Sequence, residues 1–320
     1  MCVVAKYRRR KKKKRFSWGL IIFIVILAYY VYTYGFEETF GLDPGTIETF
    51  LNGDDSDTKS SNRSVDGDLV ISFLDVGQAD AILIQNHGEN MLIDAGNNND
   101  GPLLVQYFNS LEISKFKYVI GTHPHEDHIG GLDDVINAFE VDKLYMPDVI
   151  TTTTTFTDVL DAIEKKNMKL SIPKIGDTWI LGDAILEVLY TGVNQKDLNS
   201  TSIVLKMTYG KVKFLFTGDT TSSVEKELVT KDINVDVLKV SHHGSPYSTT
   251  DSFLKASSPS YAVISVGNGN NYGHPGDTTI NKLRKANVEI HRTDQEGTII
   301  LVCDGTNVIF SSEKTNVDGG

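Results

Sequence analysis

The stretch of this chain that is richest in chemistry is the run from His123 to His128, which reads His-Pro-His-Glu-Asp-His. Three imidazoles and the Asp127 carboxylate this close together would repel or stay poorly satisfied in a packed interior, whereas a bound Zn²⁺ or Mn²⁺ would organise them. His123 and His125, two residues apart on an extended segment, can point at one ion. Asp127 and His128 begin the next turn and can face a second. The run therefore predicts a centre for two divalent metal ions.

The flanking sequence places this run at the end of a strand. The apolar residues 118–120 before it are typical of a buried strand, and residues 131–139 after it follow a helical pattern. Because α/β proteins bind ligands at the carboxyl ends of strands, this position favours a metal site over the alternative, a surface turn with scattered histidines.

Three later motifs offer side chains of the same kind. Asp219, in Thr-Gly-Asp, follows an apolar strand pattern, which predicts a carboxylate exposed at a strand end behind a flexible glycine. His242 and His243, in Ser-His-His-Gly-Ser, also follow a strand pattern. Since adjacent side chains diverge in an extended segment, one of these histidines can bind metal while the other faces substrate. A further histidine, His274, lies in Gly-His-Pro.

The elements that must position these residues alternate along the chain, with no internal repeat. Strand patterns early and late, with helical patterns between them, predict an α/β sandwich of two sheets packed face to face with helices outside. The predicted strands are 69–74, 81–85, 91–93, 118–120, 185–190, 202–208, 212–216, 235–240, 261–266 and 298–302. The predicted helices are 102–110, 131–139, 156–166, 221–231 and 276–287.

Charge is divided sharply along the chain. Nine of the 31 Lys and Arg residues fall within residues 1–15, and all 42 Asp and Glu residues come later. Residues 16–320 therefore hold 22 basic and 42 acidic side chains, a net charge of −20. Residues 16–34 are uncharged and long enough as a helix to cross a membrane. By the positive-inside rule, the N-terminus is expected in the cytoplasm and the remainder outside a cell membrane that the chain crosses once.

This pattern predicts five parts: a basic cytoplasmic tail (1–15), a transmembrane anchor (16–34), a flexible linker (35–68), a hydrolase domain (69–312) and a short tail (313–320). A cleaved signal peptide is the alternative to the anchor, but no small-x-small cleavage site follows the apolar run. Cys2 would lie on the cytoplasmic side and Cys303 alone outside, so no disulfide partner is expected, and Cys303 is predicted to be a buried strand residue.

The motifs taken together resemble the metallo-β-lactamase superfamily, whose signature is H-x-H-x-D-H. They are most similar to the extracellular hydrolase domain of ComEC-type competence proteins over about residues 69–302. The similar segments, in chain order, are Phe73 to Asp80 (FLDVGQAD, with Ala79 where Gly is commoner), Met91 to Gly96, His123 to His128, Asn199 to Ser202, Thr217 to Asp219, Ser241 to Ser245, Ser265 to Gly267 and Gly273 to Pro275.

The resemblance implies a four-layer αββα sandwich with two metal ions, Zn or Mn. It places His123 and His125 on one ion, Asp127, His128 and His243 on the other, and Asp219 between them. Asp94 would hold a ligand histidine in orientation. Asp127 would orient the attacking nucleophile, and His242 and His274 would face the phosphate of a substrate. The alternative for His274 is a turn residue before Pro275. The sequence leaves open which of His242 and His243 touches metal, although His243 is favoured, and whether Asp75, Gln78 and Asp80 shape the rim or cap strands.

One difference from other members of the superfamily narrows the range of expected substrates. No histidine occurs between His128 and His242, so the third imidazole that lactam- and thioester-cleaving relatives place on the first metal is missing. Asn199 and Ser202 occupy the corresponding stretch, which leaves the first metal open to an oxygen ligand of the substrate. A phosphodiester suits that position.

Three hypotheses follow for the whole protein. The first is a membrane-anchored phosphodiesterase or nuclease acting outside the cell, with single-stranded DNA as a candidate substrate, although an acidic body opposes DNA binding. The second is an esterase of choline-phosphate or other cell-wall phosphodiesters. The third, from another class, is a non-catalytic surface binding module that contains metal.

Overall fold

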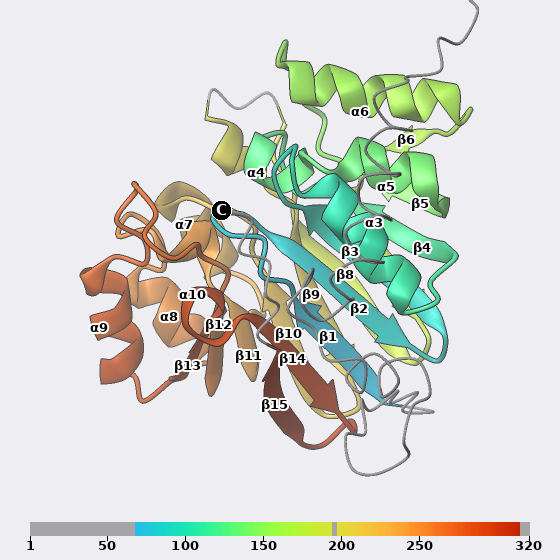
Figure 1. Ribbon diagram of the computed structural model, residues 1–320. Coiled ribbons are helices and arrows are strands. Elements are labelled where there is room, and N and C mark those ends of the chain that lie inside the picture. Colours follow the sequence, from blue (N-terminus) through green and yellow to red (C-terminus); the bar gives the residue numbers. More distant parts are fainter. Residues whose placement is uncertain (1–67, 194–196, 314–320) are drawn as a thin grey trace, which may run out of the picture. The chain divides into compact units, whose positions relative to one another are not determined.

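The computed structural model describes residues 68–193 and 197–313, which form two β-sheets flanked by helices (Figure 1). The predicted basic tail, the anchor at 16–34, all of the linker except Asp68, and residues 314–320 lie outside the described residues. No helix in the described ranges is both long and apolar enough to cross a membrane.

The first sheet has eight strands in the order β15-β14-β1-β2-β3-β4-β5-β6. Neighbouring strands from β3 to β6 run parallel, and the other pairs are antiparallel. Its members are β1 (Leu69–Phe73), β2 (Ala81–Asn86), β3 (Glu89–Ala95), β4 (Lys115–Ile120), β5 (Glu140–Tyr145), β6 (Leu170–Ser171), β14 (Thr298–Cys303) and β15 (Val308–Glu313).

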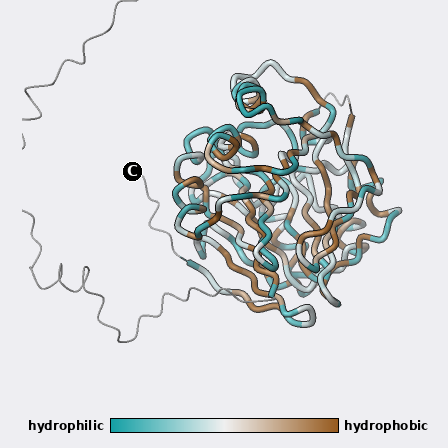
Figure 2. Tube along the Cα trace, turned by 90° about the vertical axis from the view of Figure 1, so that its right-hand side faces the viewer, coloured by the Kyte–Doolittle hydropathy of each residue, from teal (hydrophilic) through white to brown (hydrophobic). Residues whose placement is uncertain are grey.

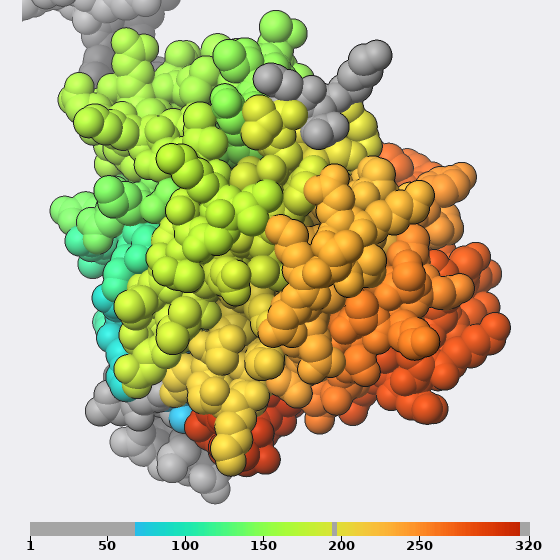
Figure 3. All heavy atoms as spheres, turned by 180° about the vertical axis from the view of Figure 1, so that it is seen from behind, coloured from blue at the N-terminus to red at the C-terminus, as the bar shows by residue number. Residues whose placement is uncertain are grey.

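The second sheet has seven strands in the order β13-β12-β11-β10-β9-β8-β7, and its neighbours from β10 to β13 run parallel. Its members are β7 (Thr178–Leu181), β8 (Ala184–Tyr190), β9 (Val204–Tyr209), β10 (Val212–Phe216), β11 (Val237–Lys239), β12 (Tyr261–Ile264) and β13 (Glu289–Arg292). Seen from behind, early residues lie on one side of the molecule and late residues on the other (Figure 3).

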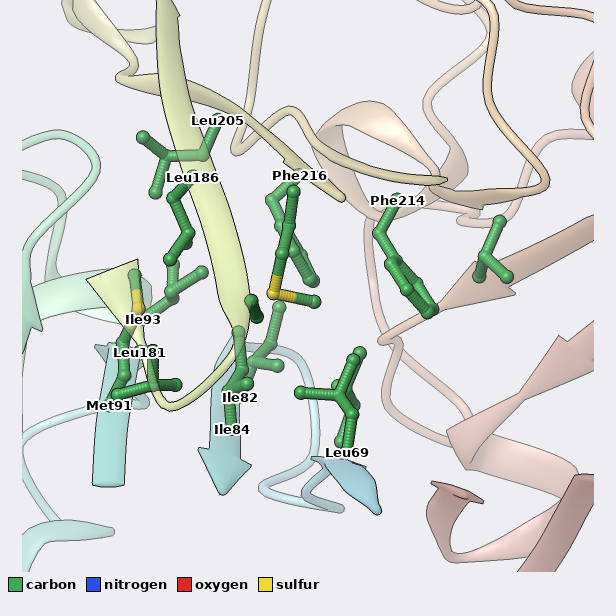
Figure 4. Close-up of a cluster of buried hydrophobic side chains, with 14 of the residues drawn as sticks. Leu69, Ile82, Ile84, Met91, Ile93, Leu181, Leu186, Leu205, Phe214 and Phe216 are labelled. Carbon is green, nitrogen blue, oxygen red and sulfur yellow. The ribbon is translucent and has the colours of Figure 1, made fainter. Parts of the chain in front are cut away.

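The two sheets bury a hydrophobic layer between them. Side chains from β1, β2 and β3 point toward side chains from β8, β9 and β10 (Figure 4). Phe214 and Phe216, two residues apart on β10, both face this layer, as the two-residue period of a strand requires. In Figure 2 the hydrophobic segments follow the strands inside, and hydrophilic segments lie in the loops and outer helices.

Helices cover the outer face of each sheet, which gives four layers. A second hydrophobic cluster joins the first sheet to α3 (Gly101–Ser110), α5 (Leu132–Ala138) and α6 (Thr154–Lys165). A third joins the second sheet to α7 (Ser222–Leu228), α8 (Asp251–Ser257) and α9 (Asp277–Lys285). The remaining short helices are α4 (Glu126–Ile129), η1 (Leu198–Thr201), η2 (Ser241–Gly244) and α10 (Thr293–Glu296). The predicted sandwich of two sheets is therefore confirmed.

Most sequence predictions of elements are confirmed, and the exceptions have physical reasons. All ten predicted strands are present, and Cys303 is fully buried at the end of β14. β5, β6, β7, β13 and β15 were not predicted, because they lie at or next to sheet edges and most of them carry only a short or partly exposed apolar pattern. The helix predicted at 221–231 ends at Leu228.

Candidate metal centre

The His123–His128 run leaves β4 at its carboxyl end and enters α4. The side chains of His123 and His128 are fully buried. His123 Nε2 lies 3.0 Å from His125 Nδ1, so two ring nitrogens face each other as two ligands of one ion would. His125 itself has extended backbone and precedes the first residue of α4, which places Asp127 and His128 on the next turn.

Four residues from both sheets bring their ligand atoms together. Each of Asp127, His128, Asp219 and His243 offers one oxygen or nitrogen atom, and these four atoms lie within 4.8 Å of one another. His128 Nε2 is 3.2 Å from Asp219 Oδ1, and His243 Nε2 is 3.3 Å from Asp127 Oδ2. Asp219 also approaches the other histidine pair, since its Oδ2 lies 4.0 Å from His123 Nε2. Asp219 therefore lies between the two groups of candidate ligands.

In His128 and His243, the two histidines of this four-residue group, the Nδ1 atom is held by a hydrogen-bond partner. We call the four residues the inner group. His128 Nδ1 lies 2.8 Å from Asp94 Oδ2, and His243 Nδ1 donates to the Ser265 backbone oxygen at 2.9 Å. His243 Nδ1 is also 3.4 Å from Asp80 Oδ1, a longer contact that we treat as electrostatic. With Nδ1 occupied in this way, the Nε2 atom of each ring is left with its lone pair toward Asp219.

The inward atoms of this group fit a metal ion. His128 Nε2, His243 Nε2 and Asp219 Oδ1 are buried and have no hydrogen-bond partner among the described residues. Orphaned buried polar atoms are costly unless something satisfies them. A mixed set of imidazole nitrogens and carboxylate oxygens suits Zn²⁺ or Mn²⁺. The residues present can therefore hold divalent metal.

Asp219 is only 1% exposed, so the prediction of an exposed carboxylate at the end of β10 was wrong. The turn before it is pressed between the two sheets: a side chain at Gly218, where φ is +51°, would come within 3.1 Å of Thr122 and 3.2 Å of Ser202. Ser202 Oγ accepts from the Asp219 backbone N–H at 3.1 Å and donates to the Asn199 backbone oxygen at 2.8 Å. Asn199 and Ser202 thus support the Asp219 turn.

The His242-His243 pair does not lie on an extended segment, as the sequence predicted, but in the tight turn η2. Both residues have left-handed backbone, with φ of 51° and 50°. Consecutive non-glycine residues in this region are uncommon and costly, and such strain is concentrated at functional sites. The turn buries His243 in the four-residue group and leaves the side chain of His242 30% exposed, with its Nε2 still 3.6 Å from Asp219 Oδ2. The two side chains diverge, as expected, but because of the left-handed turn and not because of an extended backbone.

His274 lies on the outer side of the site with His242. Their ring centroids are 5.3 Å apart, and His274 is half-buried. Burial and the neighbouring His242 and His243 lower the pKa of His274 to about 4. The ring is therefore neutral at pH 7 and can donate one N–H bond to a substrate oxygen.

Opposite charges shift the protonation of the inner group. Burial would raise the pKa of Asp127, but the hydrogen bond with His243 and the charge of His128 outweigh it and hold the pKa at about 2. Burial would lower the pKa of His243, but Asp219, Asp127 and Asp80 outweigh it and raise the pKa to about 10. Carboxylates that stay ionised at low pH are well suited to bind a cation.

The three polar residues of the Phe73 to Asp80 segment have different roles. Asp75 accepts from the Gly77 backbone within its own turn, and Gln78 accepts from the Gly267 backbone, so both organise loops. Asp80 is fully buried behind His243 and forms an ion pair with Lys239 at 2.8 Å. Burial opposes ionisation of Asp80, but Lys239 and then His243 keep its pKa below the ordinary value.

Lys239 is the residue that sequence reasoning missed. Its side chain is 1% exposed at the end of β11, and it neutralises the carboxylate behind His243. The signal was present as a lysine within the apolar run Val-Leu-Lys-Val, because an unpaired lysine is almost never buried. His87 and His291 lie in other settings, paired with Asp183 and with Glu296 respectively.

The fold and the geometry agree with comparisons to known proteins. The family model of the metallo-beta-lactamase superfamily matches residues 74–268, more than half of the chain, and the protein belongs to that superfamily. The fold of the superfamily and the candidate ligands define a metal-dependent hydrolase.

The relatives include ComEC-type competence proteins. The chain is 29% identical over 250 residues to ComE operon protein 3 of Bacillus subtilis, covering 72% of this chain and 32% of that protein. It is 26% identical over 239 residues to competence protein ComA of Neisseria gonorrhoeae, covering 73% and 32%. The match thus spans about a third of each relative. Among solved structures, the metallo-beta-lactamase fold protein YhfI of Bacillus subtilis has a TM-score of 0.51 at 14% identity, covering 76% of this chain and 100% of that one, which shows the shared fold.

Proposed function

We propose that this protein is a phosphodiesterase or nuclease that acts outside the cell, held at the membrane by residues 16–34. The observation that carries the proposal is the inner group of Asp127, His128, Asp219 and His243, whose atoms lie within 4.8 Å of one another. The absence of a histidine between His128 and His242 favours a phosphoester over a lactam. The similarity to ComEC-type competence proteins supports a nucleic-acid strand as the substrate.

When two divalent cations are bound, the chemistry they supply is polarisation of the phosphoryl oxygens and activation of the attacking water. His123 and His125 would hold one cation, Asp127, His128 and His243 the other, and Asp219 would contact both. Asp94 and the Ser265 carbonyl hold the inner histidines in the orientation that binding requires.

The remaining side chains would act on the substrate directly. Asp127 is ionised and 31% exposed at its side chain, so it can accept a hydrogen bond from the attacking water and orient it. His242 and His274 would face the phosphate, where each N–H can donate to an oxygen that gains charge.

The test uses purified full-length protein, loaded with Mn²⁺ or Zn²⁺, on single-stranded DNA, a generic phosphodiester and a choline-phosphate ester. We expect phosphodiester cleavage that a chelator abolishes. Asp127→Asn should lower kcat about 10²-fold or more, because the attacking water loses the carboxylate that positions it. Equal activity of wild type and Asp127→Asn would sink the mechanism, and two bound metals without cleavage of any substrate would favour a binding module.

The membrane placement has its own test. Protease added to intact cells should remove the hydrolase domain and leave the N-terminal tag of a tagged protein protected. Protection of the domain would contradict the predicted orientation.

A further inference from the structure

A groove outside the metal centre runs between α8 and α9, which lie side by side in Figure 1. Its volume is about 730 Å³. The charged residues that line it are Lys255, Lys282, Lys285 and Asp251, so three cations face one carboxylate. This local excess of positive charge stands out in a chain whose residues 16–320 carry a net charge of −20.

The start of α9 is joined by short contacts to the turn that carries His242 and His243. α8 begins shortly after η2, and α9 begins just after His274. The Thr279 hydroxyl on α9 donates to the Ser245 backbone oxygen at 2.9 Å, and the Gly276 N–H donates to the Gly244 oxygen at 3.0 Å. The two helices that line the groove therefore begin close in the chain to His243 and His274.

An exposed tyrosine stands in each of these loops. Tyr247, 83% exposed, lies between η2 and α8, and Tyr272, 74% exposed, lies just before His274. The Tyr272 ring is stacked with the His274 ring at 5.9 Å between centroids. Large exposed aromatic side chains at a site entrance are available for contact with a ligand's flat or cationic groups.

The three lysines of the groove differ in how exposed they are. Lys282 is half-buried and donates to the Thr249 backbone oxygen at 2.8 Å, which fixes it against the loop that carries Tyr247. Lys255 and Lys285 are exposed. From Thr278 at one end of the groove to Lys285 at the other, α9 advances about 10 Å. The cations at the far end would thus meet parts of a substrate beyond the bond that is cut.

We propose that Tyr247, Tyr272 and the α8–α9 groove form an extended binding path for a single-stranded nucleic acid. The inference rests on the proposed function and adds the surface that holds the strand. Stacking aromatic rings together with a cationic groove are the two features that single-strand binding uses. A choline group would be bound by the aromatic rings alone and repelled by the lysines.

The test measures binding separately from cleavage, using Asp127→Asn protein with Mn²⁺ and a fluorescent oligothymidylate of about 12 nucleotides. We expect Lys255→Gln with Lys285→Gln to weaken binding about tenfold at low salt and to reduce the slope of log Kd against log salt by about 1.4, since each contact contributes about 0.7. The charge-matched control, Lys143→Gln with Lys174→Gln, removes two exposed lysines elsewhere and should bind as the parent does.

The tyrosines are tested by removal and by conservative rescue. Tyr247→Ala and Tyr272→Ala should each weaken binding about tenfold, and the Phe variants should restore it, because stacking needs the ring and not the hydroxyl. Thermal unfolding and metal content check that each variant is folded.

Four results would overturn the proposal. The first is an unchanged salt slope in the lysine variant, and the second is an equal loss of affinity in its control. The third is that the tyrosine variants lose affinity only for choline phosphate, added as a competitor. The fourth is that the lysine variant loses affinity only for anionic lipid vesicles. Lysine-dependent binding without any cleavage would instead uphold the path and refute the proposed hydrolysis.

Discussion

At the scale of single residues, the inner site is organised by partners that never touch substrate. Asp94 accepts from the Thr122 backbone N–H at 2.7 Å and lies 2.8 Å from His128 Nδ1. Burial raises the pKa of this carboxyl, although His128 acts in the opposite direction. The contact between Asp94 Oδ2 and His128 Nδ1 orients the His128 ring and directs its Nε2 toward Asp219.

We predict that Asp94→Asn weakens metal binding about 10–100-fold, the range for loss of a partner that orients a ligand histidine. The asparagine amide would donate to His128 Nδ1, which would move the ring proton to Nε2. Competition with a chelating dye measures the Kd for Mn²⁺ or Zn²⁺. Asp158→Asn, an exposed change on α6, is the control, and equal affinities of the two variants would contradict the role of Asp94.

At the scale of elements, the site is assembled by turns that follow parallel strands of both sheets. β3 and β4 of the first sheet lead to Asp94 and to the His123–His128 run. β10 and β11 of the second sheet lead to Asp219 and to η2. The close packing of these turns depends on positions without side chains, and Gly244 in η2 shows this most clearly. A side chain there would come within 2.6 Å of Pro275, next to His274.

We predict that Gly244→Ala lowers the free energy of unfolding by more than Gly77→Ala and also raises KM. Both residues have positive φ, +81° and +68°, so both substitutions incur about 1–2 kcal/mol of backbone strain. Only Gly244 has a neighbour close enough to clash, and the displaced Pro275 would move His274. Urea unfolding and steady-state kinetics measure the two effects. Equal costs at the two glycines would show that the contact with Pro275 is unimportant.

At the scale of the whole molecule, the candidate centre links the two halves of the sandwich. Its carboxylates and histidines come from both sheets, and removal of metal would leave buried carboxylates whose negative charge is then balanced by protons on the histidines. In that condition His243 has a pKa of about 10 against an ordinary value of 6.5. A raised pKa of a histidine in the folded state stabilises the fold fully below pH 6.5, and this stabilisation is lost as the pH rises toward 10.

We therefore predict that chelator-treated protein loses stability as the pH is raised from 6.5 toward 10, and that Mn²⁺ or Zn²⁺ restores it most at the alkaline end. The cation replaces protons that leave at high pH, so binding becomes stronger there. Urea unfolding at a series of pH values, with and without metal, measures this. The decline should be smaller in His243→Asn, and metal-free stability that rises across this pH window would rule out the linkage.

Much of the fold could be predicted from the sequence, because its strands carry local signals. The apolar runs of β1, β10 and β14 show buried strands by composition alone. β5, next to the edge strand β6, gave no such signal because exposed polar residues interrupt it, and the edge strand β7 has only four residues.

The sequence by itself determined the kinds of ligand, their order along the chain and the strand before each of them. Only the tertiary structure decided which atoms meet. The burial of Asp219, the left-handed turn that separates His243 from His242, the Lys239–Asp80 pair and the groove between α8 and α9 all depend on contacts between residues far apart in the chain. Local patterns record which face of a strand is buried, whereas the position of a charge in the interior is fixed by the partner that neutralises it, and that partner is brought by packing.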